Sequence, residues 1–139
     1  GTNWTEVNDL NTGRTYLAGA GTNTSALAFG GTPNLATTES WNGTNWTAVN
    51  NLNTGRKSLG GFGATNTAAI AAGGSSPYTA ITESWNGTNW TEVADLSVAR
   101  NYLAGCGTST TGLVFGGYEL VASTEEWNLG PATLTITTD

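Results

Sequence analysis

The 139-residue sequence lacks or is poor in several residue types, and each shortage excludes a class of chemistry. It has no histidine, which excludes a histidine base, a histidine metal ligand and a histidine-dependent triad. Its single cysteine, Cys106, can form neither an intrachain disulfide nor a thiolate zinc cluster. No apolar run approaches the roughly 18 residues of a membrane span. We therefore expect no membrane insertion, no metal and no cofactor.

Charged residues are also scarce, at 10% of the chain, against about 25% in an ordinary globular domain. Lys and Arg together number four and the net charge is −6, which predicts no binding to nucleic-acid phosphates. Helix-forming residues are few, with no methionine and one lysine, whereas Gly, Thr and Asn are abundant. These three residue types suit turns and strand faces, so the composition predicts an all-β fold.

A threefold internal repeat is the main feature of the sequence. The segment Gly-Thr-Asn-Trp-Thr begins at residues 1, 43 and 87, which divides the chain into units 1–42, 43–86 and 87–128 and a tail, 129–139. Within the repeat an arginine, a Gly-Gly pair, a glutamate and two tryptophans recur in the same order. These structural repeat residues are Trp4, Arg14, Gly30, Gly31, Glu39, Trp41, Trp46, Arg56, Gly73, Gly74, Glu83, Trp85, Trp90, Arg100, Gly116, Gly117, Glu125 and Trp127.

Each repeat is expected to form four short strands, which the first repeat places at 15–21, 25–29, 37–41 and 45–49. The dipeptide Asn42-Gly43 predicts a hairpin between the third and fourth strands. The second strand is a continuous apolar run in every unit, which is typical of a strand covered on both faces. A four-stranded antiparallel sheet that packs between like neighbours and recurs every 40-odd residues is the blade of a β-propeller.

The repeat resembles that of the kelch family of β-propellers, over nearly the whole chain. The family pattern appears in the first repeat as Arg14, Gly30-Gly31, Glu39, Trp41 and Trp46. The sequence departs from it by placing tryptophan where tyrosine is usual before the hairpin. The resemblance implies that the arginines brace neighbouring blades against the repeat glutamates. It implies no single function, because kelch propellers include enzymes, adaptors and adhesins.

Three blades fall short of the about four to eight that close a propeller. The chain opens on a fourth strand, 3–7, and its last unit stops at a third strand, 124–127. We therefore expect either a head-to-tail homo-oligomer, with a dimer of six blades favoured, or a longer parent chain that supplies the other blades. A strand in the tail, around Leu134 and Ile136, is a rival way to complete the last sheet.

The side chains that stand out are expected to have mostly structural roles. The tryptophans recur at equivalent positions and are expected in the core between blades. Cys106 occupies an apolar strand position, which predicts a buried thiol. The loops joining second and third strands vary between units, as in a rigid scaffold that displays contact loops, although neutral variation is the alternative. The candidate ligand-binding residues in these loops are Pro33, Asn34, Pro77, Tyr78, Tyr118 and Glu119.

The sequence favours a non-enzymatic structural or attachment module, located on a virion surface or outside the cell. Arrays of Trp-Asn-Gly-Thr repeats are similar to phage structural proteins, which implies a tail fibre, a capsid decoration or a secreted adhesin with a protein or glycan receptor. One alternative is a glycan-binding, lectin-like propeller, and another is a fragment of a larger kelch protein that mediates protein–protein contacts. A hydrolase would need a convergent cluster of unlike titratable groups, and the repeat supplies only equivalent ones.

Overall fold

The computed structural model describes residues 2–75, 77–119 and 121–130, which form three antiparallel sheets. The first sheet is β1 (Ala18–Thr22), β2 (Ser25–Phe29), β3 (Thr38–Trp41) and β4 (Trp46–Val49). The second is β5 (Gly60–Thr65), β6 (Ala68–Ala72), β7 (Thr82–Trp85) and β8 (Trp90–Glu92), and the third is β9 (Ala104–Gly107), β10 (Thr111–Phe115) and β11 (Thr124–Asn128). The described part of the chain contains no helix, and so none that could cross a membrane. The predicted all-β fold is confirmed.

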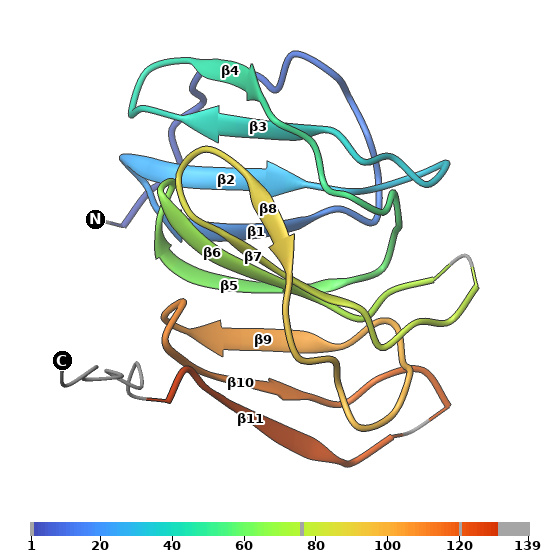
Figure 1. Ribbon diagram of the computed structural model, residues 1–139. Helices are drawn as coiled ribbons and strands as arrows, with labels where there is room; N and C mark the ends of the chain where they lie inside the picture. Colours follow the sequence, from blue (N-terminus) through green and yellow to red (C-terminus); the bar gives the residue numbers. More distant parts are fainter. Residues whose placement is uncertain (1, 76, 120, 131–139) are drawn as a thin grey trace, which may run out of the picture.

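The sheets follow one another in chain order, with the second between the first and the third (Figure 1). Within each sheet the strands pair with their neighbours in sequence, and the starting strands β1, β5 and β9 lie side by side from sheet to sheet. One cluster of buried apolar side chains lies between the first and second sheets and another between the second and third. The core is therefore divided into layers between consecutive sheets.

Asparagine side chains close the hairpins between the third and fourth strands, as the Asn-Gly pairs predict. The Oδ1 atom of Asn42 accepts hydrogen bonds from the backbone N–H groups of Thr44 and Asn45, each at 2.9 Å. Gly43 takes a φ of 94°, which favours glycine. Asn86 repeats the same bonds in the hairpin between β7 and β8. Local sequence is thus sufficient to form this turn.

The first strand of each sheet begins later than the sequence predicts. Tyr16 has a φ of 57°, and the equivalent Ser58 and Tyr102 have φ values of 55° and 54°. A left-handed residue interrupts extended backbone. Strand β1 therefore begins at Ala18 rather than at residue 15.

Phenylalanine rings of one sheet pack onto glycines of the next. Phe29 lies over Gly61 of β5, where an added Cβ would approach the ring to 2.8 Å. Phe62 lies in the same way over Gly105 and Gly112 of the third sheet. Side chains at these glycines would force the sheets apart.

The outer face of the third sheet is open among the described residues. Leu113 and Phe115 are each 40% exposed, whereas Val114 between them is buried. The expectation that every second strand is covered on both faces is therefore right for β2 and β6 but wrong for β10. Cys106, the cross-strand partner of Leu113, is also exposed. The predicted buried thiol is wrong for the same reason, because no described segment packs on this face.

Residues 3–7, predicted to be a strand, form none in the structure. Trp4 is fully exposed, so the prediction that it lies in the core is wrong. The reason is that residues 3–7 pair with no strand of the described chain. Trp41, Trp85 and Trp90 are buried as expected, and Trp46 and Trp127 are partly buried. The predicted tail strand around Leu134 and Ile136 lies outside the described residues.

Candidate functional site

Each repeat arginine forms an ion pair with the glutamate of its own sheet. Nη1 of Arg14 lies 3.1 Å from Oε1 of Glu39, and Nη2 of Arg100 lies 2.7 Å from Oε1 of Glu125. The third pair joins Arg56 and Glu83, whose side chains are 1% and 0% exposed. Since the pairs lie within a sheet, they do not brace neighbouring sheets as the resemblance implies.

The contact between sheets at this position comes instead from backbone groups. The N–H of Gly31 in the first sheet donates to the carbonyl oxygen of Arg56 at 3.0 Å, and the N–H of Gly74 donates to that of Arg100 at 2.9 Å. The Gly-Gly pairs allow this approach because Gly31 and Gly74 have φ values of 121° and 122°. The arginine side chain thus stabilises its own sheet, whereas the arginine carbonyl group joins that sheet to the preceding one.

The second oxygen of each repeat glutamate is also occupied. Oε2 of Glu83 accepts hydrogen bonds from the backbone N–H and the Nδ2 of Asn53, at 2.7 and 2.9 Å. Asn11 donates the same two bonds to Oε2 of Glu39, both at 2.8 Å. These carboxylates therefore hold the chain segment that precedes the arginine, which is a structural use of their charge.

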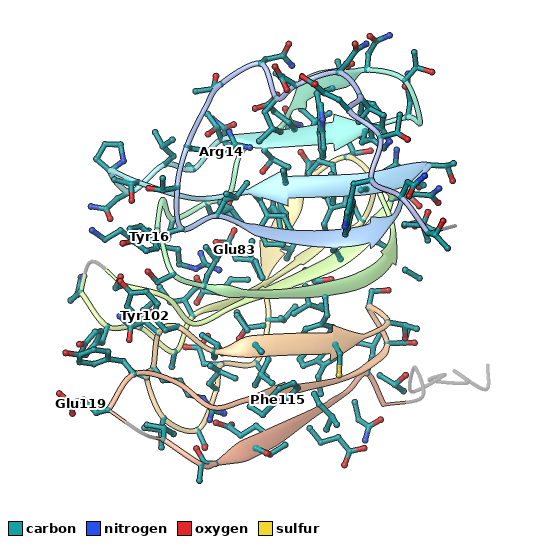
Figure 2. The ribbon with its side chains drawn as sticks, turned by 180° about the vertical axis from the view of Figure 1, so that it is seen from behind. Arg14, Tyr16, Glu83, Tyr102, Phe115 and Glu119 are labelled. Atoms are coloured by element: carbon teal, nitrogen blue, oxygen red, sulfur yellow. The ribbon has the colours of Figure 1, made fainter. Side chains whose placement is uncertain are left out.

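Three exposed tyrosines form the most prominent surface feature at one end of the sheets, and we call them the tyrosine row: Tyr16, Tyr102 and Tyr118. The rings of Tyr16 and Tyr102 are perpendicular with centroids 5.8 Å apart, and those of Tyr102 and Tyr118 are 6.0 Å apart. Each side chain is about half exposed. Figure 2 shows Tyr16, Tyr102 and Glu119 on the same side of the molecule.

Backbone hydrogen bonds, two of them between units and one within the third unit, place the tyrosine row. The N–H of Ser58 donates to the carbonyl of Tyr16, and the N–H of Tyr102 donates to the carbonyl of Ser58, both at 2.8 Å. The N–H of Tyr118 donates to the carbonyl of Asn101 at 2.9 Å. Because Ser58 and Asn101 are buried, these bonds attach the backbone of the row to the packed interior.

A hollow of about 160 Å³ lies beside the row. Its lining brings together three of the predicted binding residues, Tyr78, Tyr118 and Glu119, with Asn101 and Arg100 among the others. Pro77 is exposed in the same loop as Tyr78.

The other two predicted binding residues lie elsewhere. Pro33 and Asn34 belong to the corresponding loop of the first sheet and do not line the hollow. The backbone N–H of Asn34 donates to the carbonyl of Gly31 at 3.0 Å, which folds this loop back on itself.

Sequence reasoning missed Tyr16 and Tyr102 as surface residues. They occupy one repeat position at which the second unit carries Ser58. That difference between otherwise similar units is the signal of a surface position, whereas the predicted strand 15–21 includes Tyr16. No group of three or more His, Cys, Asp or Glu that could hold a metal ion occurs within residues 2–75, 77–119 and 121–130.

No protein-family model matches the sequence, and no curated protein sequence matches it. Among solved structures, the fold is similar to that of YjhT, with a TM-score of 0.68 over 85% of this chain and 15% sequence identity. The chain spans 43% of the length of that structure. The likeness concerns the fold alone: this chain has the all-β arrangement of part of a longer structure.

Proposed function

We propose that this protein is a non-enzymatic attachment module of kelch-like propeller architecture, on a virion surface or outside the cell. Its contact surface is the tyrosine row together with the adjacent hollow. The observation that carries the proposal is the convergence of Tyr16 of the first unit with Tyr102 and Tyr118 of the third on one exposed end of the sheets.

The arrangement of the sheets supports the propeller architecture. Three antiparallel sheets with the same strand order pack face to face in series, as the blades of a propeller do. The similarity covers 43% of a longer solved structure, which is compatible with three blades that form part of a larger ring. Within the described residues, the third sheet has three strands where the other two have four.

The surface chemistry supports attachment rather than catalysis. Tyrosine provides a large, amphipathic contact area at a low cost in side-chain entropy, and it is enriched at protein interfaces. The repeat arginines and glutamates, which are the most obvious charged candidates for catalysis, are engaged with each other inside the sheets. The exposed end is therefore better suited to binding than to proton transfer.

A glycan receptor is the second candidate, and the hollow beside the row favours it. The hollow combines the rings of Tyr78 and Tyr118 with the polar groups of Asn101 and Glu119. A concave site with aromatic walls and a few polar groups is typical of small-ligand sites. A protein receptor would use the exposed row itself, so the two candidates differ in which tyrosines they require.

Replacing the tyrosine row by serine is expected to abolish attachment without unfolding the protein. Tyr16→Ser and Tyr102→Ser introduce the residue that the second unit has at Ser58, and Tyr118→Ser introduces the residue found at Ser75. Labelled wild-type protein should bind saturably to at least one strain in a panel of intact bacterial cells. The triple variant should bind at least about tenfold more weakly, which corresponds to about 1.4 kcal/mol.

Leu129→Ser is the matched control for this experiment. Leu129 is an exposed apolar residue whose N–H donates to the carbonyl of Thr110, at the opposite end of β10 from Tyr118. It should leave binding unchanged. The attachment proposal is wrong if no cell or glycan on an array binds the wild type, or if the triple variant binds equally well. Selective loss on Tyr78→Ala, with hits on the glycan array, would identify a glycan receptor.

A further inference from the structure

The open edge of the third sheet lies beside a hollow between the second and third sheets. Strand β11 pairs with β10 on one side, and on its other side no strand of the described chain is present. The hollow beside this edge is lined by Ala72, Thr82 and Trp127, among other residues.

The equivalent place in the second sheet is filled by Trp90. The Trp90 ring lies 5.4 Å from that of Trp85 and 5.0 Å from that of Phe29, and its Nε1 donates to Oγ1 of Thr38 at 3.0 Å. In the repeat, Trp85 corresponds to Trp127, Phe29 to Ala72 and Thr38 to Thr82. The hollow at the third sheet therefore has the tryptophan and threonine walls of the Trp90 site, with the smaller Ala72 in place of Phe29. No described residue equivalent to Trp90 fills it.

Of the three tryptophans at this repeat position, Trp46 and Trp90 lie in strands, whereas Trp4 belongs to no strand. Trp4 belongs to the same Gly-Thr-Asn-Trp-Thr motif as Trp90, and it is fully exposed. Nδ2 of Asn8, which follows it, donates to Thr44 O and Asn45 Oδ1. Asn50, which follows β4, donates to Thr88 O and Asn89 Oδ1 in the same way. The chain thus passes from residues 3–7 to the first sheet in the same way as it passes from β4 to the second sheet. Residues 3–7 therefore stand where the last strand of a preceding sheet would be.

The two outer sheets also carry complementary unfilled faces. Phe115 is the equivalent of Phe29, which covers Gly61, but Phe115 is 40% exposed. Gly19 is the equivalent of Gly61, yet the only atom near its missing side chain is a backbone oxygen of its own sheet. Within the described residues, Phe115 of the third sheet therefore covers no glycine of another sheet, and Gly19 of the first sheet is covered by no phenylalanine.

We propose that a second copy of this chain completes the third sheet. Residues 3–7 of that copy pair with β11, its Trp4 enters the hollow against Trp127 and Thr82, and its first sheet covers Leu113 and Phe115. The same contact made in both directions joins two copies into a closed ring of six sheets. Two copies give a number within the about four to eight blades of known propellers, whereas three copies would give nine. The inference rests on the proposed propeller architecture but not on attachment.

The reach of the N-terminal segment excludes insertion of Trp4 into its own third sheet. Asn8 is held on the first sheet by its two hydrogen bonds, so Trp4 lies four residues from a fixed point. Four extended residues span about 14 Å. Strands β3 and β4, whose hairpin binds Asn8, lie on the opposite side of the second sheet from β11 (Figure 1). Packed sheets lie about 10 Å apart, which gives about 20 Å at this edge of the sheets.

The native mass of the chain tests this proposal. We expect the 14.2 kDa chain to run in sedimentation equilibrium at twice its own mass. Trp4→Ala should weaken the dimer by at least about 100-fold, because a central buried tryptophan is lost from both contacts. Tyr78→Ala, at another exposed aromatic residue, is the control and should leave the mass unchanged.

The thiol of Cys106 gives a second, independent measurement. Cys106 lies on the exposed face of the third sheet, whereas its equivalent Ala20 packs against the core between two sheets. In the dimer the Cys106 thiol should therefore react slowly with a disulfide reagent such as DTNB. In the Trp4→Ala monomer it should react at the rate of an accessible thiol.

Several outcomes would overturn the proposal. A wild-type monomer with a reactive thiol excludes the second copy, and a larger closed assembly excludes a ring of two. If the full chain is a monomer with an unreactive thiol, and the thiol becomes reactive in a chain that ends at residue 130, the missing strand belongs to residues 131–139. A dimer that survives Trp4→Ala uses another surface. None of these results depends on the cell-binding assay, so attachment can succeed or fail separately.

Discussion

Replacing Arg56 with alanine is expected to lower the free energy of unfolding by about 3–5 kcal/mol. Arg56 and Glu83 are both almost completely buried, so the substitution leaves a carboxylate in the interior without its partner. The guanidinium group also donates from Nε to the carbonyl of Gly73 at 2.9 Å and from Nη2 to that of Ala71 at 3.2 Å. These carbonyl groups would lose their donors at the same time.

Arg100→Ala is the matched control, because it removes the same repeat arginine where the partner is more accessible. Glu125 is 24% exposed, so water can solvate its charge when Arg100 is removed. The expected loss is clearly smaller than for Arg56→Ala. Urea denaturation at equal protein concentration measures both, in a Trp4→Ala background so that association does not add to stability. Equal losses would show that burial of the pair does not determine its contribution.

Replacing Trp90 with alanine is expected to cost about 3–5 kcal/mol, as for other buried aromatic residues truncated to alanine. Trp90 is 4% exposed and contacts residues of both the first and second sheets. Its removal would open a cavity at their interface. The same denaturation experiment measures the loss.

Two further variants separate the contributions of Trp90. Thr38→Val keeps the packing but removes the acceptor of the indole N–H, and should cost about 1–3 kcal/mol. Trp4→Ala changes the same repeat position where the side chain is exposed. In dilute monomer it should alter the unfolding free energy by no more than about 0.5 kcal/mol. A loss for Trp4→Ala similar to that for Trp90→Ala would contradict the structure.

Much of the fold could be predicted from the sequence, because it depends on local patterns that recur three times. The apolar run 25–29 is strand β2, and Asn42-Gly43 forms the expected hairpin. Where the predictions are wrong, the cause lies beyond local sequence. The sequence predicts Tyr16 within a strand, but its φ of 57°, beside a backbone hydrogen bond between sheets, interrupts the extended backbone.

The candidate site could be predicted only in part. The loop that differs most between units contributes Tyr118 and Glu119, which do line a hollow with Tyr78. The tyrosine row was not predicted, because it depends on contacts between side chains 86 and 16 positions apart, namely Tyr16 with Tyr102 and Tyr102 with Tyr118. The stacking of the sheets brings Tyr16 to Tyr102, and the fold of the third unit brings Tyr118 to Tyr102.

The sequence by itself determined the all-β class, the threefold repeat and most strand positions, because strand and turn propensities act over a few residues. Tertiary structure alone decided which copies of a repeated residue are buried. Trp90 and Trp4 lie in the same motif, but the first is buried against a preceding sheet and the second is fully exposed. Phe29 and Phe115 differ in the same way. The physical reason is that burial depends on the neighbouring sheet, and the outermost sheets of a series each lack one neighbour.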